Sequence, residues 1–497
     1  MLKKDLLIKK YFEDHSLIES NIASFNNFVR NGMPKIVTSI GEIIPTIIPP
    51  DVQDYKIKLD KAYVTKPLIV EADGSKRDIF PSEARLRNLD YSAPITLEVS
   101  SYIDGVQREN FLTEIGNLPI MVRSKYCHLN GLKPEELIKQ YEDPDDYGGY
   151  FILNGNERAL ITVEDLASNK LFIQRNKVGP SKFTAKLFSE QESYRIPHTI
   201  EQMKDGMIYI SFTRFKRVPI IALIKALGLT SDQEINHFVS PDKQYDDLFI
   251  NLYAALELKT ENDALESIGR DIGMNQPKEE KILKTQEVID RYLLPNIGVT
   301  PRDRILKAYN LCKIIKRFLM VARENYPVTD KDHYMNKRLK LSGDLISDLF
   351  IVNLRILIND ILYNFQRLVK RGKFSSIKII IREKLLTSRI QSAMATGSWV
   401  GGRKGVSQNI DRINFLATTS HLQRVVSLLS STQENFDARA LHPTHFGRLC
   451  AIETPEGTSI GLRKNLALLS KITQEETQED KIKKQLEALG LNEAKQK

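Results

Sequence analysis

The spacing of apolar residues changes along the chain, and each change predicts a different kind of element. Apolar side chains recur at three- and four-residue steps in some stretches, which is typical of amphipathic helices. Elsewhere β-branched residues mix with turn residues, which is typical of strands. We therefore expect helices at 15–30, 303–322 and 345–371, and strands within 35–50, 54–72 and 92–105.

Turn and capping residues refine these boundaries. Gly32-Met-Pro34 is expected to stop the first helix, and Asn154-Gly155 suits a type I′ turn in a hairpin over 151–165. Pro219 favours a helix start that ends near Gly228, and Ser231 to Glu234 resembles a capping box. Two further strands are expected at 193–200 and 207–212.

Length and composition divide the chain. With 497 residues, two to four domains are the usual outcome. Residues 230–300 are polar and helical in pattern, which suggests a separate subdomain from about 170 to 325. The segment after Lys471 resembles a solvated, partly helical tail, so we expect the fold to end near Ser470. The mixture of strands and helices predicts a multidomain α+β fold.

The net charge and the cysteine content favour some kinds of partner and site and argue against others. A net charge of +9 mildly favours a polyanionic partner. The three cysteines lie far apart, so neither a disulfide framework nor a zinc site made by this chain alone is expected. No apolar run is long enough for a membrane helix, and the N-terminus does not resemble a signal peptide. We expect a cytoplasmic protein with no membrane partner.

Residues 442–462, HPTHFGRLCAIETPEGTSIGL, follow neither apolar period and are expected to form a loop. His442 and His445 could be metal ligands, with Cys450 and Glu453 nearby in sequence. Pro443 argues against a helix carrying both rings, so we favour imidazoles that bond backbone or face a polyanion. No metal site is therefore expected here.

Other candidate chemistry is weaker. Asp143-Pro-Asp145-Asp146 could imitate a magnesium-binding carboxylate cluster, but the proline and the following Tyr147-Gly148-Gly149 favour a turn. The chain contains neither a GxSxG elbow nor a GxxxxGK[ST] loop, which argues against a serine hydrolase and an autonomous NTPase.

A glycine-rich basic stretch, SWVGGRKGVSQNIDR at 398–412, is the best candidate for phosphate binding. Its Gly401-Gly402 pair lies beside Arg403 and Lys404. Residues 397–465 carry eight Lys and Arg against five acids, and six of the eight are Arg. Because Arg suits positioned phosphate contacts, this region is expected to face a polyanion.

Six motifs in order carry a resemblance. The chain is similar to the N-terminal half of the second-largest subunit of multisubunit DNA-directed RNA polymerases. The matching stretches are PSEARLRNLDYSAPI (81–95), IGNLPIMVRSKYC (115–127), GGYFILNGNERALI (148–161), DKDHYMNKRLKLSG (330–343), GVSQNIDRINFLATTSHLQRV (405–425) and HPTHFGRLCAIETPEGTSIGLRKNLA (442–467). The family subunit is about twice as long, so the resemblance implies the archaeal arrangement in which it is split into two polypeptides, this one being the N-terminal piece. An artificial truncation is the competing explanation.

The resemblance also implies an architecture. The family's protrusion would take 1–165 and return at 326–380, with the lobe inserted at 166–325. The fork would take 381–470, with 427–438 as its loop near strand separation, followed by the tail at 471–497.

The implied function is that of an RNA polymerase subunit that forms one wall of the DNA cleft and approaches the active centre. The family holds its catalytic Mg2+ on an Asp triad of the largest subunit, so this chain is expected to bind no cofactor and supply no catalytic residue. Expected partners are the C-terminal half of the split subunit, the largest and other subunits, template and non-template DNA, the RNA–DNA hybrid and general transcription factors. The residues expected to face nucleic acid or the active centre are Arg403, Lys404, Gln408, Arg412, Arg424, Arg439, His442, His445, Arg448, Glu453, Glu456 and Arg463.

Two alternatives stay open at this point. One is a free-standing nucleic-acid-binding factor associated with a polymerase. The other is a metal-dependent enzyme acting through the Asp143–Asp146 or the His442–His445 stretch.

Overall fold

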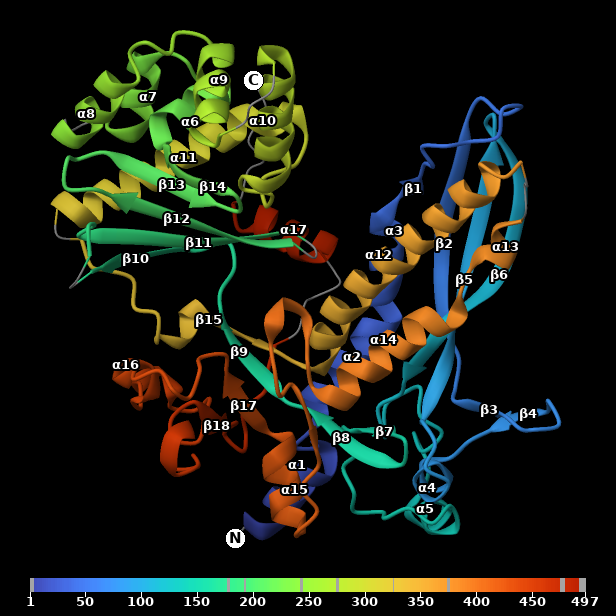
Figure 1. The fold of residues 1–497 in the computed structure, drawn as a ribbon. Helices are drawn as coiled ribbons and strands as arrows, with labels where there is room; N and C mark the ends of the chain where they lie inside the picture. Colours follow the sequence, from blue (N-terminus) through green and yellow to red (C-terminus); the bar gives the residue numbers. More distant parts are fainter. Residues whose placement is uncertain are drawn as a thin grey trace. The chain divides into compact units, whose positions relative to one another are not determined.

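The chain folds into two compact units, shown as a ribbon in the computed structural model of Figure 1. Unit 1 comprises residues 1–164 and 339–497, and unit 2 comprises residues 165–338. Both mix helices with mainly antiparallel sheets, so the expected multidomain α+β fold is confirmed. The structure describes residues 4–176, 179–191, 194–241, 245–273, 277–324, 326–372, 376–473 and 479–490.

The N-terminal helices of unit 1 depart from the sequence expectation. Helix α2 (Glu19–Asn27) runs through one π turn (Phe28–Gly32) into α3 (Met33–Ile40). The predicted stop at Gly32-Met-Pro34 is therefore wrong, because a proline in the first turn of a helix loses no hydrogen bond. The strand expected from residue 35 is also wrong over α3. Met33, Ile36 and Val37 are buried on one helical face, so packing outweighed the strand preference of β-branched residues.

A four-stranded antiparallel sheet forms the body of unit 1, in the order β1-β2-β5-β6. Alternate side chains of its long strands are buried, as expected for a sheet with one face on the core. The long helix α12 (Ser342–Val369) packs against this core through the predicted seam of Ile346, Phe350, Leu354, Leu357 and Ile361, all of which are buried. The strands are β1 (Glu42–Ile43), β2 (Tyr55–Val64), β5 (Ser92–Ile103) and β6 (Val106–Pro119), which confirms that strands form within the predicted ranges 54–72 and 92–105.

The remaining elements of unit 1 are short or belong to its C-terminal part. The helices are α1 (Lys4–Asp14), α4 (Pro81–Leu86), α5 (Pro134–Lys139), α12 (Ser342–Val369), α13 (Ile377–Ile380), α14 (Glu383–Thr396), α15 (Phe415–Leu422), α16 (Phe436–Arg439) and α17 (Glu479–Ala488). The strands are β3 (Leu68–Val70), β4 (Lys76–Asp78), β7 (Phe151–Leu153), β8 (Asn156–Leu160), β16 (Ser407–Asn409), β17 (Arg424–Ser427) and β18 (Arg463–Asn465). Strands β9 (Thr162–Leu166) and β15 (Lys337–Lys340) lie where the chain passes between the units. Helix α17 supplies the helical part of the predicted tail, whereas 474–478 and 491–497 lie outside the described residues.

Unit 2 is a five-stranded antiparallel meander whose helices cover one face of the sheet (Figure 1). Strands β12 and β13 confirm the two strands expected near 193–212. Ser231 caps α7 as predicted, with its Oγ accepting the Glu234 N–H at 3.4 Å. The strands are β10 (Leu171–Arg175), β11 (Phe183–Gln191), β12 (Tyr194–Gln202), β13 (Ile208–Phe212) and β14 (Phe215–Pro219). The helices are α6 (Ile220–Ala226), α7 (Asp232–Val239), α8 (Asp246–Ala254), α9 (Glu261–Asp271), α10 (Lys278–Tyr292) and α11 (Arg304–Arg323).

Helix α11 is the predicted 303–322 helix, with a partly different buried face. Cys312, Ile315 and Leu319 are buried as expected, but Ile305 is exposed. The buried face also includes Lys307, whose Nζ donates to the Asp290 carbonyl at 2.7 Å. At the N-terminal end of α11, the buried face therefore contains a lysine that bonds the last turn of α10, where an apolar contact was expected. None of the helices within the described ranges combines the length and apolar character needed to cross a membrane.

A buried histidine should make unit 2 sensitive to acid. His198 is 1% exposed, and its Nε2 accepts the Leu294 N–H at 3.2 Å while Nδ1 donates to the Ile196 carbonyl at 3.0 Å. Burial lowers the pKa of His198 from 6.5 to about 4. Between these values the unfolded chain binds more protons than the folded chain, so stability present above pH 6.5 is lost as pH falls toward 4. The loss is on the order of 3 kcal/mol.

Urea unfolding followed by circular dichroism between pH 7 and pH 4 checks this expectation. The native chain should lose stability faster than His198→Gln over this range, because the variant has no imidazole to charge. The variant should be less stable at pH 7, and its difference from the native chain should shrink in acid. Parallel pH profiles for the two proteins would contradict the assignment.

Candidate nucleic-acid interface

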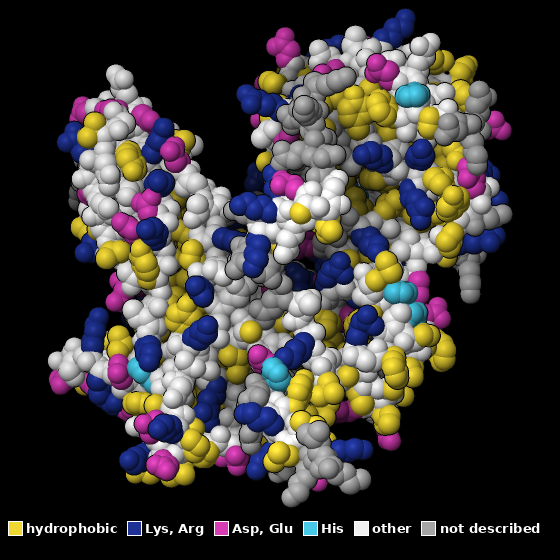
Figure 2. Space-filling model, turned by 180° about the vertical axis from the view of Figure 1, so that it is seen from behind, with side chains coloured by type: hydrophobic (Ala, Val, Ile, Leu, Met, Phe, Trp, Pro, Cys, Tyr) yellow, Lys and Arg dark blue, Asp and Glu magenta, His cyan; other side chains and the backbone are white. Residues whose placement is uncertain are grey.

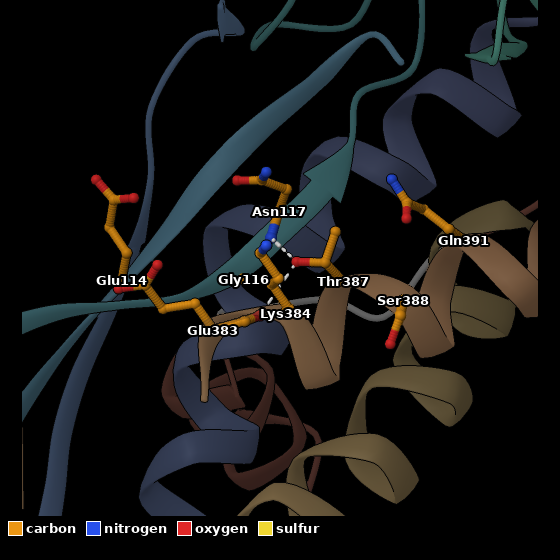
Figure 3. A pocket seen from close by; sticks show the side chains of 8 residues that line it. All are labelled: Glu114, Gly116, Asn117, Glu383, Lys384, Thr387, Ser388 and Gln391. Atoms are coloured by element: carbon orange, nitrogen blue, oxygen red, sulfur yellow. Dashed lines mark hydrogen bonds between the residues drawn. The ribbon is translucent and has the colours of Figure 1, made fainter. Parts of the chain in front are cut away.

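The C-terminal part of unit 1 starts from helix α14, which is fixed against the edge strand β6. Thr387 Oγ1 accepts the Asn117 N–H at 2.9 Å, and Figure 3 shows the two residues facing each other. A Cβ on Gly116 would lie 3.0 Å from Thr387 Oγ1, so the missing side chain allows the strand and helix to approach closely. The polar cavity drawn in Figure 3, ≈ 400 Å³, opens beside this contact. This contact fixes the position of helix α14, and so of the start of the loop that follows it.

The glycine-rich basic loop follows α14 and is anchored at its centre. Trp399 is buried, its Nε1 donates to the Leu345 carbonyl at 2.8 Å, and its backbone N–H donates to the Arg403 carbonyl at 2.8 Å. Arg403 turns inward, with Nη1 3.6 Å from Asp348 Oδ2. Lys404 is exposed. Of the two cations expected to face phosphate here, only Lys404 stands at the surface.

The hairpin next to this loop has the predicted turn. Asn154 and Gly155 both have positive φ, 48° and 76°, as a type I′ turn requires, and Leu153 pairs with Asn156. Strand β16 then adds to the hairpin, with Gln408 opposite Ala159. Two stretches that are far apart in the sequence thus form one small sheet.

An ionic network around the buried Tyr150 holds this sheet to the preceding turn. Two guanidinium groups contact the ring of Tyr150, with the Arg85 and Arg412 Cζ atoms 5.9 and 4.8 Å from its centroid. Arg412 Nε donates to Glu157 at 2.6 Å, and its Nη2 donates to Asp146 at 3.1 Å. Burial alone would lower the pKa of Arg412, but the bond to Glu157 and the nearby anions raise it above its ordinary value. Arg412 is therefore engaged within the chain.

Arg85 completes the network from helix α4. Its Nη1 donates to both oxygens of Glu142 at 2.9 and 3.0 Å, and its Nε donates to Glu157 at 2.7 Å. Its Nη2 donates to the Tyr150 hydroxyl at 2.8 Å. Burial raises the pKa of Glu142, and the Arg85 charge partly opposes that shift. Arg85 was not among the residues predicted from the sequence, although it lies in the stretch PSEARLRNLDYSAPI (81–95).

The carboxylates of Asp143 and Asp146 build a turn, as predicted. Asp143 Oδ1 accepts the Asp145 N–H at 2.9 Å, and Asp146 Oδ1 accepts the Gly148 N–H at 2.9 Å. Burial would raise the pKa of Asp146, but the hydrogen bonds from Gly148 and Tyr150 bring it below its usual value. This acid is thus held ionised as a partner for Arg412.

Strands β17 and β18 place two arginines on one face of a small sheet. Strand β17 pairs in parallel with β9 and antiparallel with β18, with Arg424 opposite Asn465 and Val426 opposite Arg463. Arg424 and Arg463 are therefore diagonal neighbours on the same face. Burial lowers the pKa of Arg424, and the Arg463 charge lowers it further. Two guanidinium groups therefore lie close together on this face of the sheet.

His421 and Gln408 lie at the border of that face. His421 Nδ1 accepts the Asp411 N–H at 3.1 Å, so its Nε2 carries the proton that it donates to Gln408 Oε1 at 3.2 Å. Burial, followed by the Arg424 charge, lowers the pKa of His421. Gln408 Nε2 donates in turn to the Gly405 carbonyl at 2.9 Å. This chain of bonds links the glycine-rich loop to helix α15.

Glu453 attaches the TPEG loop to the same sheet. Its Oε1 accepts the Asn465 Nδ2 donor at 2.9 Å and also the Ser420 hydroxyl. The second predicted acid, Glu456, is exposed. Glu453 thus positions the loop beside Arg424 and Arg463.

The opposite face of the sheet carries a buried ion pair. Lys464 Nζ lies 3.0 and 3.1 Å from the two oxygens of Glu164, and the residues are 6% and 5% exposed. Strand β17 separates the strands that bear them. The sequence contained no signal for this pair, because 300 residues separate its members.

The Arg439 guanidinium group joins two loops through hydrogen bonds. Its Nη1 and Nη2 groups donate to backbone carbonyls on both sides of α16. A Cβ on Gly461 would collide with the Arg439 backbone, so a glycine is required where these loops meet. The accepting carbonyls belong to Ser431, Gln433, Thr458 and Ile460.

The HPTH stretch is the predicted loop, with local hydrogen bonds. His442 Nδ1 accepts the Thr444 N–H at 3.2 Å, and the His445 backbone N–H donates to the His442 carbonyl at 2.9 Å. His445 is buried, whereas Arg448 is exposed with Nη1 3.2 Å from the Thr444 carbonyl. Within the described ranges, no three His, Cys, Asp or Glu side chains are grouped as metal ligands.

The predicted residues thus separate into two groups. In the first group, Lys404, Arg448, Glu456 and Arg463 are exposed, and Arg424 is half-buried beside Arg463; Arg412 and Glu453 of the second group are exposed as well. The structural group fixes loops through bonds within the chain: Arg403, Gln408, Arg412, Arg439, His442, His445 and Glu453. That all twelve residues face nucleic acid or the active centre stays a prediction. The observed hydrogen bonds and ion pairs show that the second group stabilises the loops.

Two family profiles and several curated proteins match this chain. A family profile described as RNA polymerase beta subunit matches residues 16–388, and one described as RNA polymerase Rpb2, domain 3, matches residues 408–472. The chain is 41% identical to DNA-directed RNA polymerase subunit Rpo2N of Methanocaldococcus jannaschii, over 98% of each chain. It is 39% identical to Rpo2N of Halobacterium salinarum, over 99% of this chain and 97% of the relative.

The chain spans less than half the length of a longer relative. The chain is 42% identical to subunit Rpo2 of Saccharolobus solfataricus over 94% of its own length but only 41% of that protein. The resemblance expected from the six motifs is confirmed. The chain belongs to the RNA polymerase beta subunit family, the family of the second-largest subunit.

Proposed function

We propose that this chain is a subunit of a DNA-directed RNA polymerase and binds the nucleic acid beside the active centre during RNA synthesis from NTPs. The observation that carries the proposal is the exposed set of Lys404 and Arg448 on loops and Arg463 on strand β18. Such cations grip backbone phosphates without reading sequence. The relatives are named as DNA-directed RNA polymerase subunits, which supports this function.

The charge distribution agrees with this role. Lys and Arg side chains are spread over much of the face shown in Figure 2, with apolar side chains between them. In the candidate interface, Glu453 accepts hydrogen bonds from Asn465 and Ser420, and Asp146 accepts from Arg412, whereas Glu456 is exposed. Lys404, Arg448 and Arg463 are exposed to solvent, where a polyanion can reach them.

The family's Mg2+ would be held elsewhere in the assembled enzyme. Within the described residues no carboxylate cluster suits a divalent ion, and Glu453 already accepts from Asn465 and Ser420. In this proposal the metal supplies the chemistry of nucleotidyl transfer from the largest subunit. This chain's residues hold the loop path and neutralise phosphates around it.

Partners are proposed from the exposed apolar surface. Ile413, Leu416, Phe436, Phe446 and Ile452 are all strongly exposed in the C-terminal part of unit 1. Large exposed apolar side chains in one region are typical of an interface. We assign this surface to the C-terminal half of the split protein and neighbouring subunits, working in the cytoplasm with transcription factors. The names protrusion (1–165 and 326–380), lobe (166–325) and fork (381–470) remain assignments by family resemblance.

Removing the three exposed cations should weaken nucleic-acid binding by the assembled polymerase. We expect Lys404→Ala/Arg448→Ala/Arg463→Ala to bind a scaffold with a preformed RNA–DNA hybrid less tightly. The slope of log affinity against log salt concentration should fall by about 2 to 3, because each lost phosphate contact removes about 0.9. Titration of the scaffold at several salt concentrations measures both quantities.

A matched triple variant controls for net charge. Lys66, Lys133 and Lys139 are exposed lysines outside the candidate interface, and replacing them with Ala removes the same charge. This variant should keep the native salt slope. If both triple variants behave alike, or if neither changes elongation or binding, the proposed interface is wrong.

A further inference from the structure

Unit 2 contains a cavity that the proposed function does not use. Its volume is ≈ 440 Å³, within the usual range of ligand pockets. The start of β11, the turn between β12 and β13, helix α8 and the end of α11 line it. These elements lie at the ends of the sheet and on its helical layer in Figure 1.

The cavity wall includes a buried amide that needs an acceptor. Gln202 ends strand β12 and is 8% exposed. Its Nε2 has no hydrogen-bond acceptor among the residues that the structure describes. A buried N–H without a partner is unfavourable, so an oxygen atom entering this wall would be stabilising. The ligand should therefore carry an acceptor.

Cations dominate the rim of the cavity. Lys182 and Lys204 are exposed there, and Arg323 is fixed at the end of α11 because its Nη2 donates to Asp247 Oδ1 at 2.6 Å. Arg323 and Asp247 offset each other's charge, so the remaining charges on the rim are Lys182 and Lys204 against Asp205. The excess of positive charge favours an anionic ligand.

Apolar side chains continue from the cavity onto the surface of α8. Phe183 and Met203 line the cavity together with Ile250, which is 44% exposed. On the same helix Phe249 and Tyr253 are 42% and 77% exposed. A small carboxylate would be contained by the cavity and leave this surface uncovered. An extended polypeptide would cover both.

We propose that this cavity and the α8 surface bind a short acidic peptide segment of another protein. One apolar side chain enters between Phe183 and Ile250, while carboxylates of the segment lie near Lys182, Lys204 and Arg323. The Gln202 amide turns to donate to a peptide oxygen, because its Nε2 is covered by protein atoms in the free chain. This site is separate from the proposed nucleic-acid interface, so either proposal can fail alone.

Selection of random phage-displayed peptides on the immobilised full chain tests the proposal. Enriched peptides should combine Asp or Glu with Leu, Ile or Phe. Synthetic copies should lose about tenfold or more in affinity with Lys182→Glu/Lys204→Glu and with Ile250→Glu, since each change removes a rim charge or the apolar contact. Lys216→Glu, an exposed cation on β14, is the matched control and should bind as the native chain does.

Gln202→Leu separates binding from folding. It removes the buried donor, so the free chain should unfold at a higher temperature while the peptides bind more weakly. A purely structural Gln202 would give lower stability and unchanged peptide affinity. The proposal is overturned if no enriched peptide responds to the Lys182/Lys204 or Ile250 variants, or if the enriched peptides are basic. Unfolding midpoints of all variants exclude misfolding as the cause.

Discussion

Lys464→Met should lower the free energy of unfolding of unit 1 by about 3–5 kcal/mol, because it leaves the Glu164 carboxylate buried without its cation. Both oxygens of Glu164 face Lys464 Nζ within 3.1 Å, and both residues are almost fully covered. Breaking such a pair is costly even where forming it contributes little net stability. The loss would disturb the sheet that carries Arg424 and Arg463 on its other face.

The double variant gives the decisive comparison. Glu164→Leu/Lys464→Met removes both charges and should recover most of the lost stability, since apolar pairs of similar volume replace buried ion pairs at little cost. Urea unfolding followed by the fluorescence of Trp399, the single tryptophan of the chain, reports on unit 1. If the single and double variants are equally unstable, the ion pair does not account for the effect.

Arg85→Gln should cost about 3 kcal/mol and should also loosen the 405–412 stretch. Arg85 is the cation for Glu142, which is buried, and shares Glu157 with Arg412. With Arg85 gone, Glu142 is expected to take up a proton, because burial already raises its pKa. Amide hydrogen exchange of 405–412 should therefore become faster than in the native chain.

A lysine at this position tests the geometry of the contact. Arg85→Lys keeps the charge but cannot make the two-pronged contact to Glu142 while reaching Glu157 and Tyr150. We expect it to recover only a minor part of the loss. A double-mutant cycle with Arg412→Gln should show coupling, because both arginines contact Glu157 and Tyr150. Additive losses would mean that the two halves of the network act independently.

Local sequence patterns were reliable where a few neighbouring residues decide the outcome. The Asn154-Gly155 turn and the Ser231 cap formed as predicted, because φ preference and a side-chain oxygen act within three residues. The buried seam of α12 also followed from its period. Met33, Ile36 and Val37 show the limit, since the same residues fit a strand by type and a helix by spacing. Their burial against unit 1 selected the helix.

The sequence by itself determined the family, the basic glycine-rich character of the candidate interface and the loop path of 442–462. Only the tertiary structure decided which cations are available to a ligand. Arg412 and Arg439 have the same side chain as Arg448 and Arg463, but their guanidinium groups are used by Glu157, Asp146 and backbone carbonyls. Those partners come from distant positions or from loop carbonyls, whose placement depends on the packing of the whole unit. Residue type therefore predicts that a site can bind phosphate, whereas the fold selects the side chains that reach it.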